Sequence, residues 1–127
     1  MGAVHVTVAI RNPAEPDRVW EGLFLVNSGA IDTLVSRQRL EAIGLTPKGQ
    51  RIYGLDDSSE IRVGVAGGQI EFMGETTWGT ITFGEPDAEP LLGVTALESV
   101  GIDVDPRNGT LHRLPAVRMR GGFRPGP

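Results

Sequence analysis

The residues best suited to chemistry lie in a short polar turn, Asn27-Ser28-Gly29-Ala30, which follows the apolar run Phe24-Leu25-Val26. An amide, a hydroxyl and a glycine at the end of a strand can offer hydrogen-bonding groups and an accessible backbone to a ligand. Asp32 and Thr33 follow before the apolar sequence resumes. Asn, Ser and Gly are also common turn formers for local reasons, so an ordinary turn is the alternative interpretation.

Other site chemistries have less support in the sequence. The chain contains no cysteine, which rules out a disulfide framework and a thiolate nucleophile. Its two histidines, His5 and His112, are isolated on strand-like segments, without the spacing of metal ligands. We therefore expect neither a metal ion nor a cofactor.

The composition predicts one globular, turn-rich domain of 127 residues with 18 glycines and 9 prolines. We place this domain at residues 1–115, followed by a flexible basic tail at 116–127 that carries three arginines and no acid. A docking signal is the alternative role for the tail. A net charge of -4 gives no reason to expect nucleic acid as a partner. No apolar run approaches membrane-spanning length, so we expect no membrane association and a cytoplasmic location.

The elements that must position the turn are mostly strands. Alternating β-branched residues at 4–10 and an apolar segment at 18–26 predict a hairpin that ends at Asn27. Short helices are expected at 37–43, with Ser36 as N-cap and Gly44 as left-handed stop, and at 94–100, ending at Gly101. Further strands are expected at 50–55, 60–63, 69–74, 76–83, 102–105 and 109–114.

One segment is repeated within the chain. Leu40-Glu41-Ala42-Ile43-Gly44-Leu45 returns as Leu97-Glu98-Ser99-Val100-Gly101-Ile102, 57 positions later, each time behind an apolar strand. The repeat suits a fold whose halves are related by an internal pseudo-two-fold axis. Two short helices with similar endings are the alternative explanation.

Several of these features together resemble the retropepsin-like aspartic proteases. The 27–30 turn is similar to the family's active-site turn, and the Pro90-Leu91-Leu92-Gly93-Val94 segment to its second signature. The strand pair at 50–63 lies where the family has its flap, and 101–106 is similar to bacterial members. The resemblance implies an all-β fold: a closed acid-protease-like β-barrel with a flap hairpin and one or two short helices, forming a single lobe that homodimerises.

The resemblance also implies a function. Family members are aspartic endopeptidases in which two subunits contribute one aspartate each, and the paired carboxylates share a proton and activate a water. The implied partners are a second copy of the chain and an extended peptide or protein substrate. Ser28 would bridge the two turns and Gly29 would admit the substrate backbone. The residues expected to bind substrate are Ala30, Asp32, Tyr53, Gly54, Leu55, Asp56 and Asp57.

Asn27 occupies the position of the family's catalytic aspartate. An amide cannot accept the proton of the water, so this chain is expected to be inactive. Either a deliberate Asp-to-Asn replacement or a natural non-catalytic relative would give this sequence, and the otherwise intact signature favours the replacement. The alternative function is a non-catalytic peptide-binding or dimerisation module, and an unrelated β-barrel is a third possibility.

Overall fold

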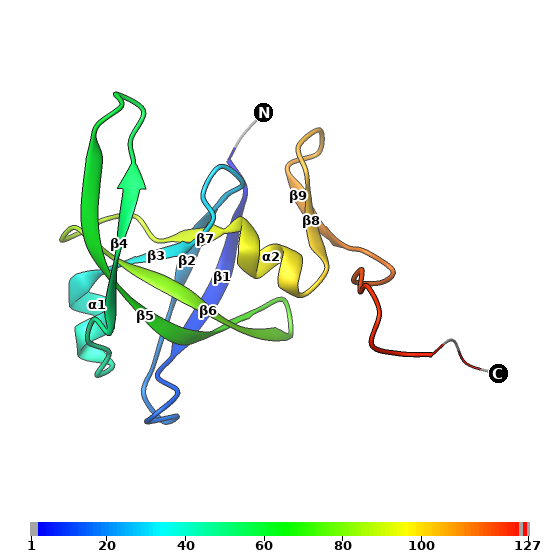
Figure 1. The fold of residues 1–127 in the computed structure, drawn as a ribbon, viewed down its shortest axis with the longest axis horizontal. Coiled ribbons are helices and arrows are strands. Elements are labelled where there is room, and N and C mark those ends of the chain that lie inside the picture. The colour runs from blue at the N-terminus through cyan, green and yellow to red at the C-terminus, as the bar shows by residue number, and fades with distance from the viewer. Residues whose placement is uncertain (1–2, 125, 127) are drawn as a thin grey trace.

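Six strands close into a mixed β-barrel in the computed structural model, which describes residues 3–124 and 126 (Figure 1). The order around the barrel is β1-β2-β7-β3-β6-β5, and β5 pairs back with β1. The β2–β7 and β3–β6 pairs are parallel, and the other pairs are antiparallel. The barrel elements and the short helices are β1 (His5–Arg11), β2 (Val19–Asn27), β3 (Thr33–Ser36), α1 (Arg37–Ala42), β5 (Glu60–Phe72), β6 (Glu75–Gly84), β7 (Leu91–Gly93) and α2 (Val94–Ser99).

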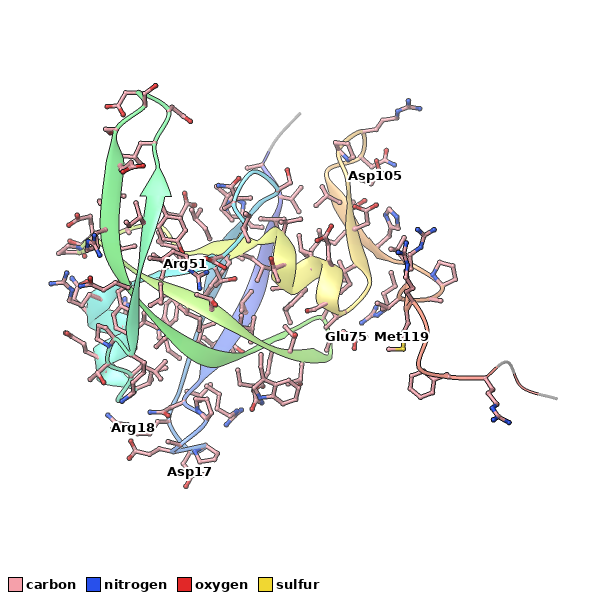
Figure 2. The ribbon with its side chains drawn as sticks, viewed as in Figure 1. Asp17, Arg18, Arg51, Glu75, Asp105 and Met119 are labelled. Carbon is pink, nitrogen blue, oxygen red and sulfur yellow. The ribbon has the colours of Figure 1, made fainter. Side chains whose placement is uncertain are left out.

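Two hairpins extend from the barrel. Strand β4 (Gly49–Gly54) pairs with the first half of β5, and the tip of this hairpin projects beyond the barrel (Figure 1). Strands β8 (Ile102–Asp105) and β9 (Thr110–Arg113) form a separate two-stranded sheet beyond α2. The β1–β2 loop with Asp17 and Arg18 lies at the opposite end of the molecule from the β4–β5 tip (Figure 2). The part of the chain described here contains no helix long and apolar enough to cross a membrane.

The local patterns predicted most elements correctly. The β1–β2 hairpin is confirmed, and β2 ends at Asn27 as expected. Both helices are confirmed, and their stops at Gly44 and Gly101 have φ angles of 83° and 70°. Ser36 is at the N-cap position of α1, but its side chain makes no capping hydrogen bond. Its hydroxyl is therefore available for another contact.

The separate strand predicted at 69–74 is wrong, because β5 is one strand that runs without a break from residue 60 to 72. The misleading residues are the glycines of the middle segment. A Cβ on Gly68 would lie 2.4 Å from Ile81 Cδ1, and a Cβ on Gly64 would lie 2.9 Å from the ring of Pro47. These glycines permit close packing inside a strand and do not end it.

The barrel interior forms one apolar core, supplied by the inward faces of the strands and by both helices. Its largest fully buried apolar side chains are those of Phe24, Ile10, Leu40, Ile70, Ile81, Leu92, Leu97, Val8 and Val35. Leu40 of α1 and Leu97 of α2 are equivalent residues of the repeated segment, and both are buried in this core. Burial of such side chains from water is the main stabilising contribution to a fold of this kind.

The strand registers explain the internal repeat as a pseudo-two-fold axis. Leu25 lies opposite Leu91 in the β2–β7 pair, and Leu34 lies opposite Thr82 in the β3–β6 pair. Moving each residue by 57 positions converts one pair into the other. The β3–β7 contact, Leu34 opposite Leu91, maps onto itself in the same way. The pseudo-two-fold interpretation is therefore supported over a chance likeness of two helix endings.

Candidate functional site

The turn after β2 is held by the side chain and the carbonyl of Asn27. Gly29 N–H donates to Asn27 Oδ1 at 3.0 Å, and Ala30 N–H donates to the Asn27 carbonyl at 3.1 Å. Asn27 is half-buried, whereas Ser28 and Gly29 are exposed. An Asn side chain that accepts from the backbone two residues ahead is a common way to fix such a turn. The turn therefore presents its hydroxyl and its glycine to solvent.

Gly93 brings the 90–94 segment of the sequence against this turn. Asn27 lies opposite Gly93 in the β2–β7 pair. A Cβ on Gly93 would lie 2.5 Å from the Ile31 oxygen and 2.5 Å from the Asp32 carbonyl carbon. The buried Thr33 hydroxyl accepts a hydrogen bond from Gly93 N–H at 3.1 Å. A residue larger than glycine therefore cannot occupy position 93 unless the turn backbone moves.

The same turn satisfies the free N–H groups at the start of α2. Val94 N–H donates to the Ala30 carbonyl at 2.8 Å, and Thr95 N–H donates to the Ile31 carbonyl at 3.3 Å. The first N–H groups of any helix lack partners inside the helix. The turn and α2 therefore stabilise each other, and the position of Ser28 and Gly29 depends on both.

Asp32 links the turn to the β4–β5 hairpin. Tyr53 donates its hydroxyl to Asp32 Oδ2 at 2.6 Å, and Arg51 Nη1 donates to the same oxygen at 2.7 Å. The Tyr53 hydroxyl also lies 2.8 Å from Thr82 Oγ1 on β6. Burial raises the pKa of Tyr53, and the hydrogen bond to Asp32 raises it further. We call this set of four side chains the Asp32 cluster.

The structure brings together some of the predicted site residues and leaves others apart. Asp32 and Tyr53 are in contact, close to the turn that contains Asn27, Ser28, Gly29 and Ala30. Among the described residues, no hydrogen bond joins Gly54, Leu55, Asp56 or Asp57 to that turn. These four residues lie at the projecting tip of the hairpin (Figure 1).

The hairpin tip closes without a glycine. Ser58 adopts the left-handed conformation with φ of 70°, and Leu55 N–H donates to the Ser59 carbonyl at 2.8 Å. Asp57 accepts from both the hydroxyl and the backbone N–H of Ser59, and these bonds lower the pKa of Asp57. The tip is therefore an ordered turn built from short polar side chains.

Sequence reasoning missed Arg51 and Thr82 as members of the Asp32 cluster. Arg51 is two residues before Tyr53 on β4, so both side chains point to the same face of the strand. The two-residue spacing could therefore have identified Arg51 as a neighbour of Tyr53 from the sequence. Thr82 comes from β6, and only the closed arrangement of strands brings it to Tyr53.

Two cavities border the turn. Ser28 contributes to one of about 220 Å³ between α2 and β8, together with Leu97 and Ile102. Asp32 contributes to a smaller one of about 150 Å³, whose rim carries Ile31 and Trp78. These two apolar side chains are 68% and 67% exposed, so the surface beside the Asp32 cluster can contact apolar groups of a ligand.

Within residues 3–124 and 126, no cluster of three or more His, Asp or Glu side chains is arranged to hold a metal ion. Neither the models of known protein families nor the curated proteins give a match to this chain.

Proposed function

We propose that the 27–32 turn is one half of an aspartic-endopeptidase site of the retropepsin-like type, completed by the same turn of a second copy and neutralised by Asn27. The observation that carries this proposal is the contact between the turn and Gly93. The two segments that resemble the family's signatures pack together, although Thr33 and Gly93 are 60 residues apart in sequence. The closed mixed barrel with its projecting β4–β5 hairpin is consistent with the same family.

An aspartate at position 27 would supply the missing chemistry. Two carboxylates facing each other across a two-fold axis share one proton, because both cannot ionise at close range. One carboxylate then takes a proton from a water molecule while the other donates a proton to the peptide carbonyl. The attacking water needs no metal ion or cofactor in this scheme.

The hairpin has the role of a flap in this proposal. The Asp32 cluster ties strand β4 to the turn through Arg51 and Tyr53, whereas the tip at residues 55–59 makes no hydrogen bond to the turn within the described chain. A strand held at Arg51 and Tyr53 with an untethered tip beyond it suits a segment that closes over an extended peptide. The peptide would pair with exposed backbone and place alternate side chains in pockets.

Asn27 preserves the geometry of the turn and removes its acid–base chemistry. Its Oδ1 accepts from Gly29 N–H, a bond that an aspartate oxygen accepts equally well. The amide group is a donor where the reaction needs a proton acceptor. The Asn27 chain is therefore expected to bind peptide in the cleft of the dimer without hydrolysing it.

The test is the Asn27→Asp variant, assayed with a broad peptide library from acidic to neutral pH. We expect it to cleave peptides and to bind a pepstatin-type inhibitor, whereas the Asn27 chain should cleave no peptide and bind the inhibitor more weakly. Asn108→Asp makes the same chemical change in the β8–β9 turn and should leave the chain inactive. A folded, dimeric Asn27→Asp protein with no cleavage and no inhibitor binding would contradict the proposal.

A non-catalytic peptide-binding or dimerisation module is the second candidate. It is favoured by the way Asn27 is accommodated, since its oxygen is hydrogen-bonded and its NH₂ group meets no acceptor among the described residues. Such an amide can donate to a peptide carbonyl. This candidate predicts that the Asn27 chain binds extended peptides and that Asn27→Asp adds no turnover.

A further inference from the structure

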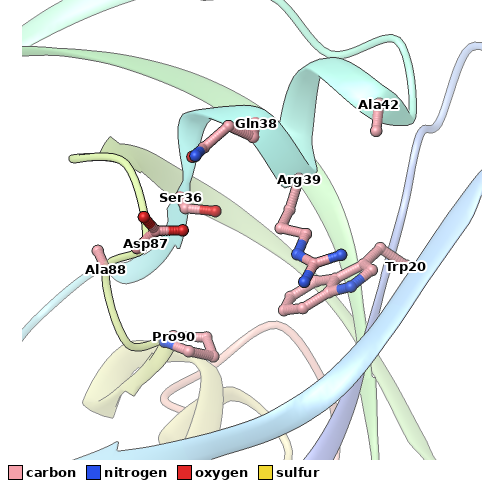
Figure 3. A pocket seen from close by; sticks show the side chains of 8 residues that line it. All are labelled: Trp20, Ser36, Gln38, Arg39, Ala42, Asp87, Ala88 and Pro90. Atoms are coloured by element: carbon pink, nitrogen blue, oxygen red, sulfur yellow. The ribbon is translucent and has the colours of Figure 1, made fainter.

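The β6–β7 loop at residues 85–90 is the counterpart, in the other half of the pseudo-two-fold, of the turn between β2 and β3, but it closes differently. Ser36 stands 57 positions before Gly93 and therefore occupies the equivalent place at the end of β3. The turn backbone packs directly on Gly93, because no Cβ is present there. At Ser36 a side chain occupies that space. A cavity of about 380 Å³ remains between the 85–90 loop, β2 and α1 (Figure 3).

One wall of this cavity is a fixed aromatic ring with a cation over it. The Arg39 guanidinium lies 5.5 Å from the centre of the Trp20 ring. Phe24 packs beside Trp20 at 5.6 Å between ring centres. Gly22 lies under the ring, since a Cβ there would be 2.7 Å from two Trp20 ring carbons. The ring is therefore held by its neighbours, with the exposed Arg39 guanidinium over it.

The cavity also has an acid and an unused hydroxyl. Asp87 lines it from the loop, and within the described chain neither Asp87 nor Arg39 makes an ion pair. Ser36 is only 6% exposed, and its hydroxyl has no hydrogen-bond partner among the described residues. Figure 3 shows this hydroxyl directed into the space that separates Arg39 from Asp87. Among the described residues no buried side-chain polar atom lacks a partner, so this hydroxyl is open to the cavity and free to bond to what the cavity holds.

We propose that this cavity binds a free α-amino acid in its zwitterionic form. The ligand carboxylate accepts hydrogen bonds from Arg39 and Ser36, and its ammonium group donates to Asp87. The ligand side chain lies against Pro90 and the free edge of Trp20. The site is separate from the 27–32 turn and does not depend on the function proposed there.

The charges of the walls favour a zwitterion over other small ligands. A phosphate or a simple carboxylate would bind Arg39 but face the negative charge of Asp87, and a simple amine would meet the reverse problem. The cavity volume is within the range of about 300–1,000 Å³ that is usual for small-molecule sites. Both charges of an amino acid find a partner here.

The test follows the indole N–H signal of Trp20 by NMR. The chain has two tryptophans, so Trp78→Phe leaves Trp20 as the only indole reporter. This protein is titrated to millimolar concentration with each of the standard α-amino acids, and separately with acetate and with methylammonium. We expect a saturable shift with at least one amino acid and binding at least about tenfold weaker for acetate and methylammonium. No shift with any amino acid, or equal binding of acetate or methylammonium, would overturn the proposal.

Matched variants assign the two charges. Arg39→Gln and Asp87→Asn should each weaken amino-acid binding at least about tenfold. Asn suits position 87, where φ is 62°, because Asn tolerates the left-handed conformation. Arg37→Gln on the same helix and Glu85→Gln on the same loop change neighbouring charges that do not line the cavity, and should leave binding unchanged. Equal effects of the lining and the control variants would also overturn the proposal.

Discussion

The 27–32 turn and the 85–90 loop occupy equivalent places in the two halves of the barrel and have different structures. The first is tied to its neighbours by the Thr33–Gly93 hydrogen bond and by two bonds to the start of α2. Within the described chain, no backbone hydrogen bond joins the second to α1. The repeated topology therefore fixes where the two segments lie, and the local residues decide what each can do.

The difference depends on one pair of equivalent residues, Gly93 and Ser36. Without a Cβ at 93, the turn backbone closes on the end of β7, and Ser28 and Gly29 are held in a defined position. Position 36 carries a side chain, and Ser36 lines a polar cavity together with Asp87 and Ala88 of the loop. The comparison predicts that Gly93→Ser lowers the free energy of unfolding much more than Ser36→Gly does.

The largest effect is expected for Gly93→Ser. Its Cβ would meet the backbone of Ile31 and Asp32 at 2.5 Å, and backbone cannot give way as a flexible side chain can. We expect a loss of about 3 kcal/mol or more in the free energy of unfolding, measured in urea. Ser36→Gly, the reverse change in the other half, should cost about 1 kcal/mol or less. Similar losses for the two variants would contradict the comparison.

The second-largest loss of stability is expected when the hydrogen bond from Gly93 N–H to the Thr33 hydroxyl is removed. Thr33→Val keeps the shape of the side chain but leaves the buried Gly93 N–H without its acceptor. We expect the free energy of unfolding to fall by about 2 kcal/mol. Thr7 is an exposed threonine on β1, and Thr7→Val should change it by no more than about 0.5 kcal/mol. Equal effects would mean that the bond does not hold the turn.

Among the described residues, the 85–90 loop has no tyrosine–carboxylate cluster, and its Glu89 lies 3.4 Å from His5 instead. The single tyrosine of the chain reports on the Asp32 cluster directly. The phenolate absorbance of Tyr53 should titrate above the pH of a free tyrosine, because burial and the Asp32 hydrogen bond raise its pKa. Asp32→Asn should bring the titration back part of the way, since burial remains. An unchanged titration in Asp32→Asn would show that the hydrogen bond is not formed.

The same shift makes a stability prediction. Because the pKa of Tyr53 is raised in the folded state, its neutral hydroxyl stabilises the fold. This stabilisation is fully present below the ordinary tyrosine pKa and is lost as the pH rises through the raised value. Tyr53→Phe should therefore lower the free energy of unfolding by about 1 kcal/mol near neutral pH. The difference from the Tyr53 protein should shrink at strongly alkaline pH, which urea unfolding across that range would measure.

The smallest change in the free energy of unfolding is expected for the Arg11–Glu71 ion pair, which joins β1 to β5. Arg11 donates to Glu71 at 2.8 Å and lowers the pKa of Glu71. The stabilisation is therefore present above the ordinary glutamate pKa and is lost as the pH falls through the lowered value. Glu71→Gln should cost about 0.5 kcal/mol at neutral pH and nothing at strongly acidic pH. A constant loss across the acidic range would indicate a packing effect.

The sequence predicted the elements with local signals and missed the features that need distant partners. Period-two alternation identified β1, an apolar segment identified β2, and glycines after short apolar periods identified the ends of α1 and α2. The continuity of β5 was missed, because the role of its glycines depends on Ile81 and Pro47. The pairing of β1 with β5, which closes the barrel, likewise has no local signal.

The candidate site was predictable to a similar extent. The turn at Asn27 follows from its residue types, whereas the family resemblance drew attention to Gly93 and implied that Tyr53 and Asp32 lie near the cleft. Their direct hydrogen bond, and the contribution of Arg51 and Thr82, depend on how β4 and β6 are brought to the turn. The cavity beside the 85–90 loop also escaped prediction, since it results from packing around Ser36.

The central claim is that the 27–32 turn is half of a site completed by a second copy, and a single cysteine tests it most directly. The chain has no cysteine of its own, so Ser28→Cys gives an unambiguous readout. If two turns face each other, mild oxidation should link the chains rapidly through residue 28. Asp17→Cys, at the far end of the barrel in Figure 2, should link much more slowly. Equally slow linking of the two variants at concentrations where the chain is dimeric, or a chain that is monomeric throughout, would contradict the claim.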